Sequence, residues 1–293
     1  MGLNDFLNYI EHEKRMSSYT VVAYKSDLNQ FIDFAHGLVD DFEWKTVDGF
    51  LIREWVVFLM GKGMAPRTVH RKISALKSLY RFYLVNGYVV KDPTSLVVLP
   101  KIRKKLPFFV RIKEMDNLFD HDNFRDDFSG VRDKAILHVL YGTGMRLSEL
   151  VGLKRRNIDF AQKKMKVLGK GNKERIVPFN DELSHVMSRY LLFCDGLFDE
   201  KNDVFFLTDK GEQVYHKFVY RVVKRYLARV STISKKSPHV LRHSYATHML
   251  NSGADLRAIQ ELLGHASLAS TEVYTHTTFD KLRKVYKQAH SRG

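Results

Sequence analysis

Apolar side chains recur at three- and four-residue intervals through the first ninety residues, the spacing that places them on one face of a helix. The pattern predicts four helices, of which the first begins at Leu3 and the second follows Ser18. The third is centred on Trp55, and the fourth starts at Pro66, a residue suited to a first helical turn. Because four apolar stripes can cover one another, we place a small helical domain at residues 1–91.

A break in this pattern separates the helical domain from the rest of the chain. Three prolines interrupt the segment from residue 92 to residue 107. From Lys101 to Lys113 the chain has six basic residues and no acidic ones. We interpret residues 92–107 as a basic interdomain linker.

The remaining residues, 108–293, mix helical and strand periodicities. Two alternating runs, Met165–Leu168 and Arg175–Phe179, predict a β-hairpin around a glycine-rich turn, and Val204–Leu207 predicts a further strand. Helical patterns precede and follow these strands. The expected fold class is mainly α, with a four-helix N-terminal domain and a mixed α+β C-terminal domain that holds a small antiparallel sheet.

The charge balance favours a polyanionic partner. The 293 residues include 48 Lys and Arg against 33 Asp and Glu, a formal net charge of +15, which fits nucleic acid and also fits an ordinary basic protein. One cysteine, Cys194, excludes an internal disulfide and a multi-cysteine metal site. No apolar run approaches the ~20 residues that span a bilayer, and no signal-peptide pattern is present. We therefore expect a cytoplasmic protein with no membrane partner.

Two short motifs place basic side chains where they could act on an anion. Arg146 falls just inside a predicted helix start, and Glu149, three residues later, could orient its guanidinium. Lys170 lies in the glycine-flanked hairpin turn, where a lysine can project into a groove and give up a proton. Taken alone, each motif also fits a solvated surface side chain.

A third motif raises the question of a metal. His239 and Arg242 are one helical turn apart and are expected to face the same site. His239 and His243 have the i, i+4 spacing of a zinc pair. Because a guanidinium stands beside that pair and no glutamate follows the first histidine, we predict no metal site.

A fourth motif supplies a candidate nucleophile. His265 precedes Tyr274 by nine residues. A lone tyrosine is usually packing, but its phenol becomes a usable nucleophile where arginines, a lysine and histidines stabilise its anion. Arg146, Arg242 and His265 could bind the non-bridging oxygens of a phosphoryl-transfer transition state. Lys170 could then protonate the departing 5′ oxygen.

Proton and energy balance complete this hypothesis. His239 could take the proton from Tyr274 as the phenol attacks. A covalent phosphotyrosine would conserve the energy of the broken bond for rejoining. We therefore expect no cofactor, neither ATP nor a divalent metal.

The order of these residues along the chain resembles the active-site set of the tyrosine recombinases, the phage integrase family. The surrounding segments resemble its Xer-type members, and the similarity extends over both domains. The residues that carry it are Arg146, Lys170, His239, Arg242, His265 and Tyr274, within segments 169–175, 238–244, 263–265 and 274–290.

The resemblance implies a site-specific recombinase that cuts and rejoins DNA through a covalent 3′-phosphotyrosine. It implies a core-binding domain at 1–91 and a catalytic domain at 108–293 that clamp double-stranded DNA. The implied assembly is a tetramer on two DNA sites, formed by copies of this chain or with a related recombinase, and a DNA translocase is a candidate activator. Because the first bundle begins at Leu3, without room for an arm-binding domain, we expect resolution of chromosome or plasmid dimers; the alternative is a compact mobile-element integrase.

Two other classes of protein fit part of the pattern. A DNA-binding regulator would explain the charge but leave the ordered phosphoryl-transfer groups without a purpose. A type IB topoisomerase would use similar chemistry to relax supercoils. The tail favours the recombinase, since the resemblance implies that a helix after Thr278 inserts into a neighbouring catalytic domain. The apolar stripe of that predicted helix is Phe279, Leu282, Val285 and Tyr286.

Basic residues of the fourth helix, the linker and one later helix are the predicted DNA contacts. On the later helix they oppose a stripe of valines, a pattern that is equally typical of a solvated face. The predicted contacts are Arg67, Arg71, Lys72, Lys101, Arg103, Lys104, Lys217, Arg221, Lys224 and Arg225.

Overall fold

The fold is mainly α-helical with one small sheet, as the sequence predicts. The chain divides into two compact units, Met1–Lys105 and Leu106–Gly293, each with its own buried apolar core. No helix within the described residues is long and apolar enough to cross a membrane. The computed structural model describes residues 2–102, 108–120, 123–169, 174–198 and 203–264.

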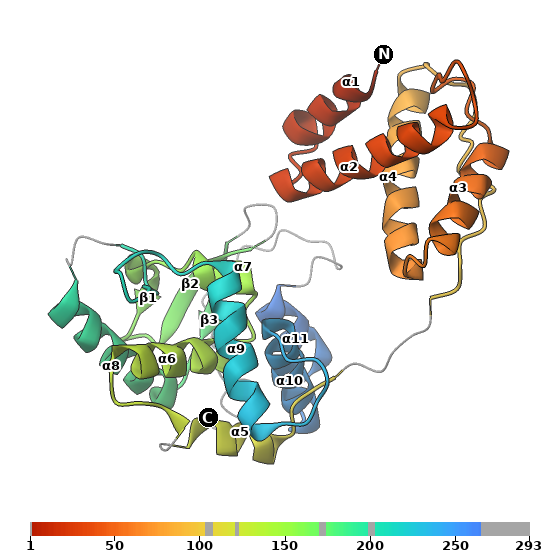
Figure 1. Ribbon diagram of the computed structural model, residues 1–293. Helices are drawn as coiled ribbons and strands as arrows, with labels where there is room; N and C mark the ends of the chain where they lie inside the picture. Colours follow the sequence, from red (N-terminus) through yellow and green to blue (C-terminus); the bar gives the residue numbers. More distant parts are fainter. Residues whose placement is uncertain (1, 103–107, 121–122, 170–173, 199–202, 265–293) are drawn as a thin grey trace. The chain divides into compact units, whose positions relative to one another are not determined.

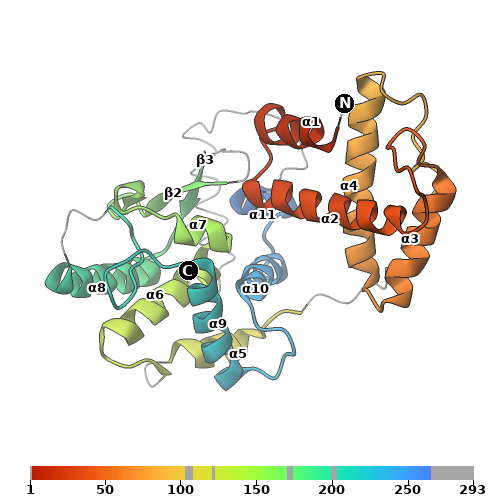
Figure 2. The ribbon, with the colours of Figure 1, turned by 45° about the horizontal axis from the view of Figure 1, so that its top comes forward.

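Helices build the N-terminal unit, in which α2 crosses α4 while α1 and α3 also pack on α4 (Figures 1 and 2). The side chains of Ser17 and Asp48 accept hydrogen bonds from backbone N–H groups at the starts of α2 and α3, and Pro66 is the first residue of α4. The four predicted helices are confirmed, and the first continues into a π-helical turn. Their bounds are Leu3–Asn8 for α1, Tyr9–Glu13 for the π-helical turn, Ser18–His36 for α2, Gly49–Gly61 for α3 and Pro66–Val85 for α4.

Aromatic side chains fill the centre of this unit. The ring of Phe31 lies 5.9 Å from that of Trp44 and 5.0 Å from that of Trp55. The Tyr80 hydroxyl donates to the backbone oxygen of Trp44 at 3.0 Å. Since Trp44 lies between α2 and α3, the connection between these helices belongs to the core and not only to the surface.

A largely buried helix, α6 (Phe128–Thr143), is the centre of the C-terminal unit. Three helices of similar length pack on it: α8 (Asp181–Leu197), α9 (His216–Val230) and α10 (Pro238–Asn251), as Figures 1 and 2 show. The other helical segments of the described residues are α5 (Ile112–Phe119), α7 (Leu147–Val151), a 3-10 turn at Arg155–Asn157 and α11 (Leu256–Leu263).

The sheet is a hairpin with a short edge strand. Its strands β1 (Ile158–Asp159), β2 (Lys164–Leu168) and β3 (Glu174–Pro178) are antiparallel and lie in that order. Val167 of β2 pairs with Arg175 of β3. The predicted hairpin is confirmed: Leu168 ends the first strand as predicted, and the other three strand ends are displaced by one residue.

The strand predicted at Val204–Leu207 is wrong. Val204 and Leu207 form only isolated bridges, to Lys154 and Gln213. The backbone N–H of Leu207 donates instead to the hydroxyl of Tyr190 at 2.8 Å. Phe205, Phe206 and Leu207 are fully buried, which makes the run apolar. Their backbone groups bond to scattered partners, Leu153, Val214 and the Tyr190 side chain, and not to one neighbouring strand.

Gly144 ends α6 in a backbone conformation that favours glycine. Its φ is +60°, and an added Cβ would lie 2.5 Å from Cδ1 of Tyr245 and 2.8 Å from Cδ2 of Leu263. Glycine therefore lets the chain turn from α6 into α7 while α10 and α11 pack directly against the turn.

We expect Gly144→Ala to lower the free energy of unfolding of the C-terminal unit by about 3 kcal/mol, since it adds both backbone strain and an overlap with Tyr245. Gly196→Ala is the matched control, because Gly196 lies in α8 with no atom within 4 Å of an added Cβ. That control should stabilise the unit by about 0.5–1 kcal/mol. Denaturant unfolding of both variants measures the difference, and equal effects would contradict this account of Gly144.

Candidate active site

Arg146 is held by a carboxylate and a carbonyl. It is the N-cap of α7, one residue before the helical position predicted for it. Its backbone N–H donates to Oε2 of Glu149 at 2.6 Å and its Nη1 donates to Oε1 at 2.8 Å, which confirms the predicted orientation by Glu149. Its Nη2 donates to the backbone oxygen of Gly264 at 2.7 Å. With 28% of its side chain exposed, Arg146 remains accessible.

Arg175 is the residue of this cluster that the sequence interpretation missed. Its Nη1 and Nη2 donate to the two carboxylate oxygens of Glu149 at 2.6 and 2.8 Å, and its Nε donates to the backbone oxygen of Leu262 at 3.0 Å. From the sequence, Arg175 belongs to the predicted hairpin and to segment 169–175, and it has no predicted role of its own. A signal was available, because period-two alternation places Arg175 on the same face of β3 as the buried Val177.

Arg242 reaches the same place from α10. Its Nη1 donates to the backbone oxygen of Gly144 at 2.6 Å and its Nη2 to that of Leu263 at 2.7 Å. Burial, followed by the charges of Arg146 and Arg175, lowers the pKa of Arg242 to about 10. The guanidinium therefore stays protonated at neutral pH in spite of its surroundings.

Three guanidiniums thus meet at the C-terminal end of α11. Arg175, Arg242 and Arg146 donate to the carbonyls of Leu262, Leu263 and Gly264 respectively, at the end where a helix leaves its last carbonyls without internal partners. Among the described residues, Glu149 is the one carboxylate bonded to these arginines. The three guanidiniums and this carboxylate together carry a formal excess of two positive charges. An anion such as a phosphate is the ligand that this excess favours.

The remaining predicted site residues fall on α10 or outside the described residues. His239 is exposed on the first turn of α10, whereas Arg242, one turn later, is buried, so the two differ in exposure. Within the described part of the chain, no three His, Cys, Asp or Glu residues are grouped so as to hold a metal ion. Lys170, His265 and Tyr274 lie outside the described residues.

The basic residues predicted on α9 lie on its exposed side, opposite the buried valines. Two of them have partners in their own unit. The Nη2 of Arg221 donates to the hydroxyl of Tyr215 at 2.6 Å, and Nη1 of Arg225 lies 3.5 Å from Asp133. All four predicted residues, Lys217, Arg221, Lys224 and Arg225, are exposed.

The basic residues predicted in the N-terminal unit separate into two kinds. Arg67, Arg71 and Lys101 are exposed, and Arg71 also bonds to Asp27. The prediction that Lys72 contacts DNA is wrong, since Lys72 is 3% exposed and donates to Asp27 at 2.9 Å. Lys72 is a structural cation and is not available to a phosphate. Arg103 and Lys104 lie outside the described residues.

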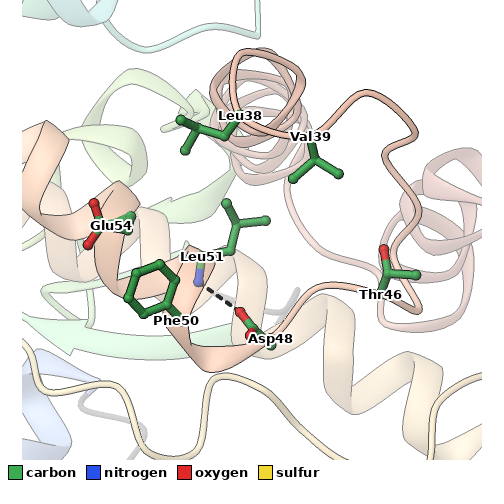
Figure 3. A pocket seen from close by; sticks show the side chains of 7 residues that line it. All are labelled: Leu38, Val39, Thr46, Asp48, Phe50, Leu51 and Glu54. Carbon is green, nitrogen blue, oxygen red and sulfur yellow. Dashed lines mark hydrogen bonds between the residues drawn. The ribbon is translucent and has the colours of Figure 1, made fainter.

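A separate pocket lies in the N-terminal unit, where α3 begins (Figure 3). The Asp48 side chain there accepts a hydrogen bond from the backbone N–H of Leu51 at 2.8 Å. None of the predicted catalytic or DNA-contacting residues lines this pocket. Its lining residues are Leu38, Val39, Thr46, Asp48, Phe50, Leu51 and Glu54.

Known proteins resemble this chain over both units. Residues 3–87 match the family model for the phage integrase N-terminal SAM-like domain, and residues 109–281 match that of the phage integrase family. The tyrosine recombinase XerC of Chlorobaculum parvum is 40% identical, over 98% of this chain and 94% of that protein.

Solved structures resemble it as well. The crystal structure of XerA recombinase is 28% identical, with a TM-score of 0.50 over the full length of both chains. XerH site-specific recombinase, in a pre-cleavage complex with its difH substrate, has a TM-score of 0.69 over 96% of this chain and 84% of that one. At 21% identity the second likeness concerns the fold alone.

Proposed function

We propose a mechanism for this chain, which belongs to the phage integrase family and is a Xer-type tyrosine recombinase, an enzyme that cuts and rejoins DNA at specific sites. Tyr274 is the proposed nucleophile. Its hydroxyl oxygen bonds to the phosphorus of the scissile phosphodiester while the bond from phosphorus to the 5′ oxygen breaks. His239 accepts the tyrosine proton and Lys170 protonates the 5′ oxygen, which leaves a 3′-phosphotyrosine and a free 5′ hydroxyl.

The convergence of Arg146 and Arg242 on the end of α11 supports this mechanism. Each guanidinium has five N–H donors, of which the bonds described above use two. The donors that remain suit the non-bridging oxygens of the scissile phosphate, with His265 as a third donor. Because Glu149 and a carbonyl already fix Arg146, and two carbonyls fix Arg242, little reorganisation is needed when the phosphate binds.

Rejoining reverses these steps. The 5′ hydroxyl of the partner strand attacks the phosphotyrosine, Lys170 takes its proton, and the Tyr274 oxygen leaves and is reprotonated. The number of phosphoester bonds is unchanged, so the proposed cycle consumes no ATP.

DNA contacts outside the active centre are proposed for the exposed basic residues. Arg67 and Arg71 would contact phosphates from α4, and the basic face of α9 would lie in or beside a groove. Exposure and like charge on one helix face support this assignment. Lys101 of the linker, followed in the sequence by Arg103 and Lys104, would add further phosphate contacts.

We also propose a tetramer on two DNA sites, formed by this chain alone or with a related recombinase. The helix predicted after Thr278 would insert into the neighbouring catalytic domain and link one subunit's Tyr274 to the next subunit. The apolar stripe of that segment supports the proposal, because such a stripe requires a partner surface.

The proposed cellular role is resolution of chromosome or plasmid dimers, with a DNA translocase as a candidate activator. The likeness to a protein named tyrosine recombinase XerC supports this role over that of a mobile-element integrase. Candidate chromosomal sites that carry a nick opposite the cleavage position would trap the covalent intermediate.

Tyr274→Phe should form no covalent adduct on such a nicked site. It should bind the site with nearly unchanged affinity, because the substitution removes one hydroxyl and very little contact surface. Arg242→Ala should lower the cleavage rate by about 100-fold or more with a smaller loss of affinity. Denaturing gels measure the adduct and mobility shifts measure binding. Tyr19→Phe, at an 81% exposed tyrosine, is the control. A 3′-linked adduct in Tyr274→Phe would remove Tyr274 from this role.

Arg67→Ala and Lys72→Met both remove a cation from α4, but the first should change DNA binding and the second should change stability. Loss of Arg67 should reduce by about one the slope of log affinity against log salt concentration, with little change in stability. Loss of Lys72 should destabilise the N-terminal unit by about 3 kcal/mol, because the buried Asp27 then keeps only the half-exposed Arg71 as a cationic partner. It should leave the salt slope unchanged at temperatures where the variant is folded. An unchanged slope for Arg67→Ala would place that residue in solvent.

Truncation after Thr278 should preserve binding of one monomer to a half-site and reduce paired-site assembly and recombination, because the proposed link between subunits is lost. Mobility shifts on single and paired half-sites measure the two steps. A truncated protein that recombines paired sites at the full-length rate would contradict the exchanged helix. A truncated monomer that cannot fold would instead indicate that the segment packs on its own domain.

A further inference from the structure

Arg175 links the Glu149 carboxylate to the C-terminal end of α11, and Arg146 and Arg242 bond to one or both of these. Through Nη1 and Nη2 it holds both carboxylate oxygens of Glu149, and through Nε it holds the end of α11 at Leu262. Its side chain is 5% exposed, and all three of its nitrogen atoms already donate hydrogen bonds within the protein. Its aliphatic part also packs on Gly264, where an added Cβ would lie 3.1 Å from Cδ of Arg175.

We propose that Arg175 is a positioning residue for strand cleavage, which fixes Glu149 and the C-terminal end of α11 so that Arg146 and Arg242 present their free donors to the scissile phosphate. It does not touch the phosphate itself. The inference rests on the proposed roles of Arg146 and Arg242.

The Glu149 carboxylate is the first route by which Arg175 acts. Burial alone raises the pKa of Glu149, but the hydrogen bonds and charge of Arg175, followed by the bonds from Arg146, outweigh burial and hold that pKa below its ordinary value. The ionised carboxylate then accepts two hydrogen bonds from Arg146. Without Arg175, a buried carboxylate with one arginine partner would more readily take up a proton and release Arg146.

The end of α11 is the second route. Arg146 and Arg242 each use one donor on carbonyls of this terminus, at Gly264 and Leu263. Arg175 holds the preceding carbonyl, that of Leu262, and packs on Gly264, whose φ is +64°. Since His265 follows Gly264 directly in the sequence, Arg175 also fixes the point from which the His265 segment begins.

A pH-resolved cleavage experiment distinguishes positioning from general structural support. Single-turnover adduct formation on a nicked site is measured between about pH 5.5 and 8 for the wild type, Arg175→Met, Glu149→Gln and the double variant. Arg175→Met should cut about 10-fold more slowly than the wild type near pH 8 and about 100-fold more slowly near pH 5.5, with affinity for DNA changed less than about 3-fold. In this variant burial is no longer offset by Arg175, so the pKa of Glu149 rises. The carboxyl then protonates as the pH falls, and the cleavage rate falls with it.

The double variant decides the mechanism. Glutamine does not titrate, so Glu149→Gln combined with Arg175→Met should be slow and lose the additional acid sensitivity. Arg175→Lys retains the positive charge without the forked geometry and should cut at an intermediate rate. If Arg175→Met does not fold, Arg175→Lys is measured in the same design and should show a weaker acid sensitivity that Glu149→Gln again removes.

Arg132→Met is the matched structural control, because Arg132 is also buried and bonds to Asp133 at 3.1 Å and Asp209 at 3.0 Å. It should lower thermal stability without an added acid dependence of cleavage. Three results would each overturn the proposal. The Arg175 variants could cut at the wild-type rate, the double variant could keep the acid sensitivity, or the loss of cleavage rate could simply follow the loss of stability, as in Arg132→Met. Full cleavage by Arg146→Ala would instead overturn the proposed role of Arg146, whereas an inactive Arg146→Ala with normal Arg175 variants defeats the positioning role alone.

Discussion

The buried carboxylate of Glu149 is the interaction on which the arrangement of the candidate active site depends. Four hydrogen bonds reach its two oxygens, two from Arg146 and two from Arg175. A buried charge of this kind is strongly destabilising when it loses a partner, because desolvation is then uncompensated. The carboxylate therefore positions both guanidiniums, and the two arginines in turn keep the carboxylate ionised.

Distant parts of the chain must meet correctly for this to happen. Arg146 follows the turn at Gly144, Arg175 comes from β3 and Arg242 from α10, and all three donate to the last carbonyls of α11. The turn at Gly144 is itself part of this arrangement, since its carbonyl accepts from Arg242 and α10 leaves no room there for a side chain. Backbone carbonyls thus perform as much of the positioning as side chains do.

The sequence predicted what local periodicity determines. The four N-terminal helices, the hairpin and the pairing of Arg146 with Glu149 follow from spacings of two to four residues. Sequence could not predict that Arg175 meets a carboxylate 26 residues away, or that Lys72 turns inward to an aspartate 45 residues away, because tertiary packing sets those contacts. The strand predicted at Val204–Leu207 was wrong for a related reason, since the burial of Phe205, Phe206 and Leu207 produces the same apolar run as a strand.

The excess of positive charge bears directly on the proposed chemistry. The negative end of α11 offsets about half a charge, which leaves most of the excess of two around Arg146, Arg175 and Arg242. A phosphodiester brings one negative charge, whereas the phosphorane-like state formed when the tyrosine anion attacks it carries about two. Cations that are already fixed by carbonyls and by Glu149 match the second state better than the first. The same charge excess that is costly in the free protein therefore favours the transition state over the bound substrate.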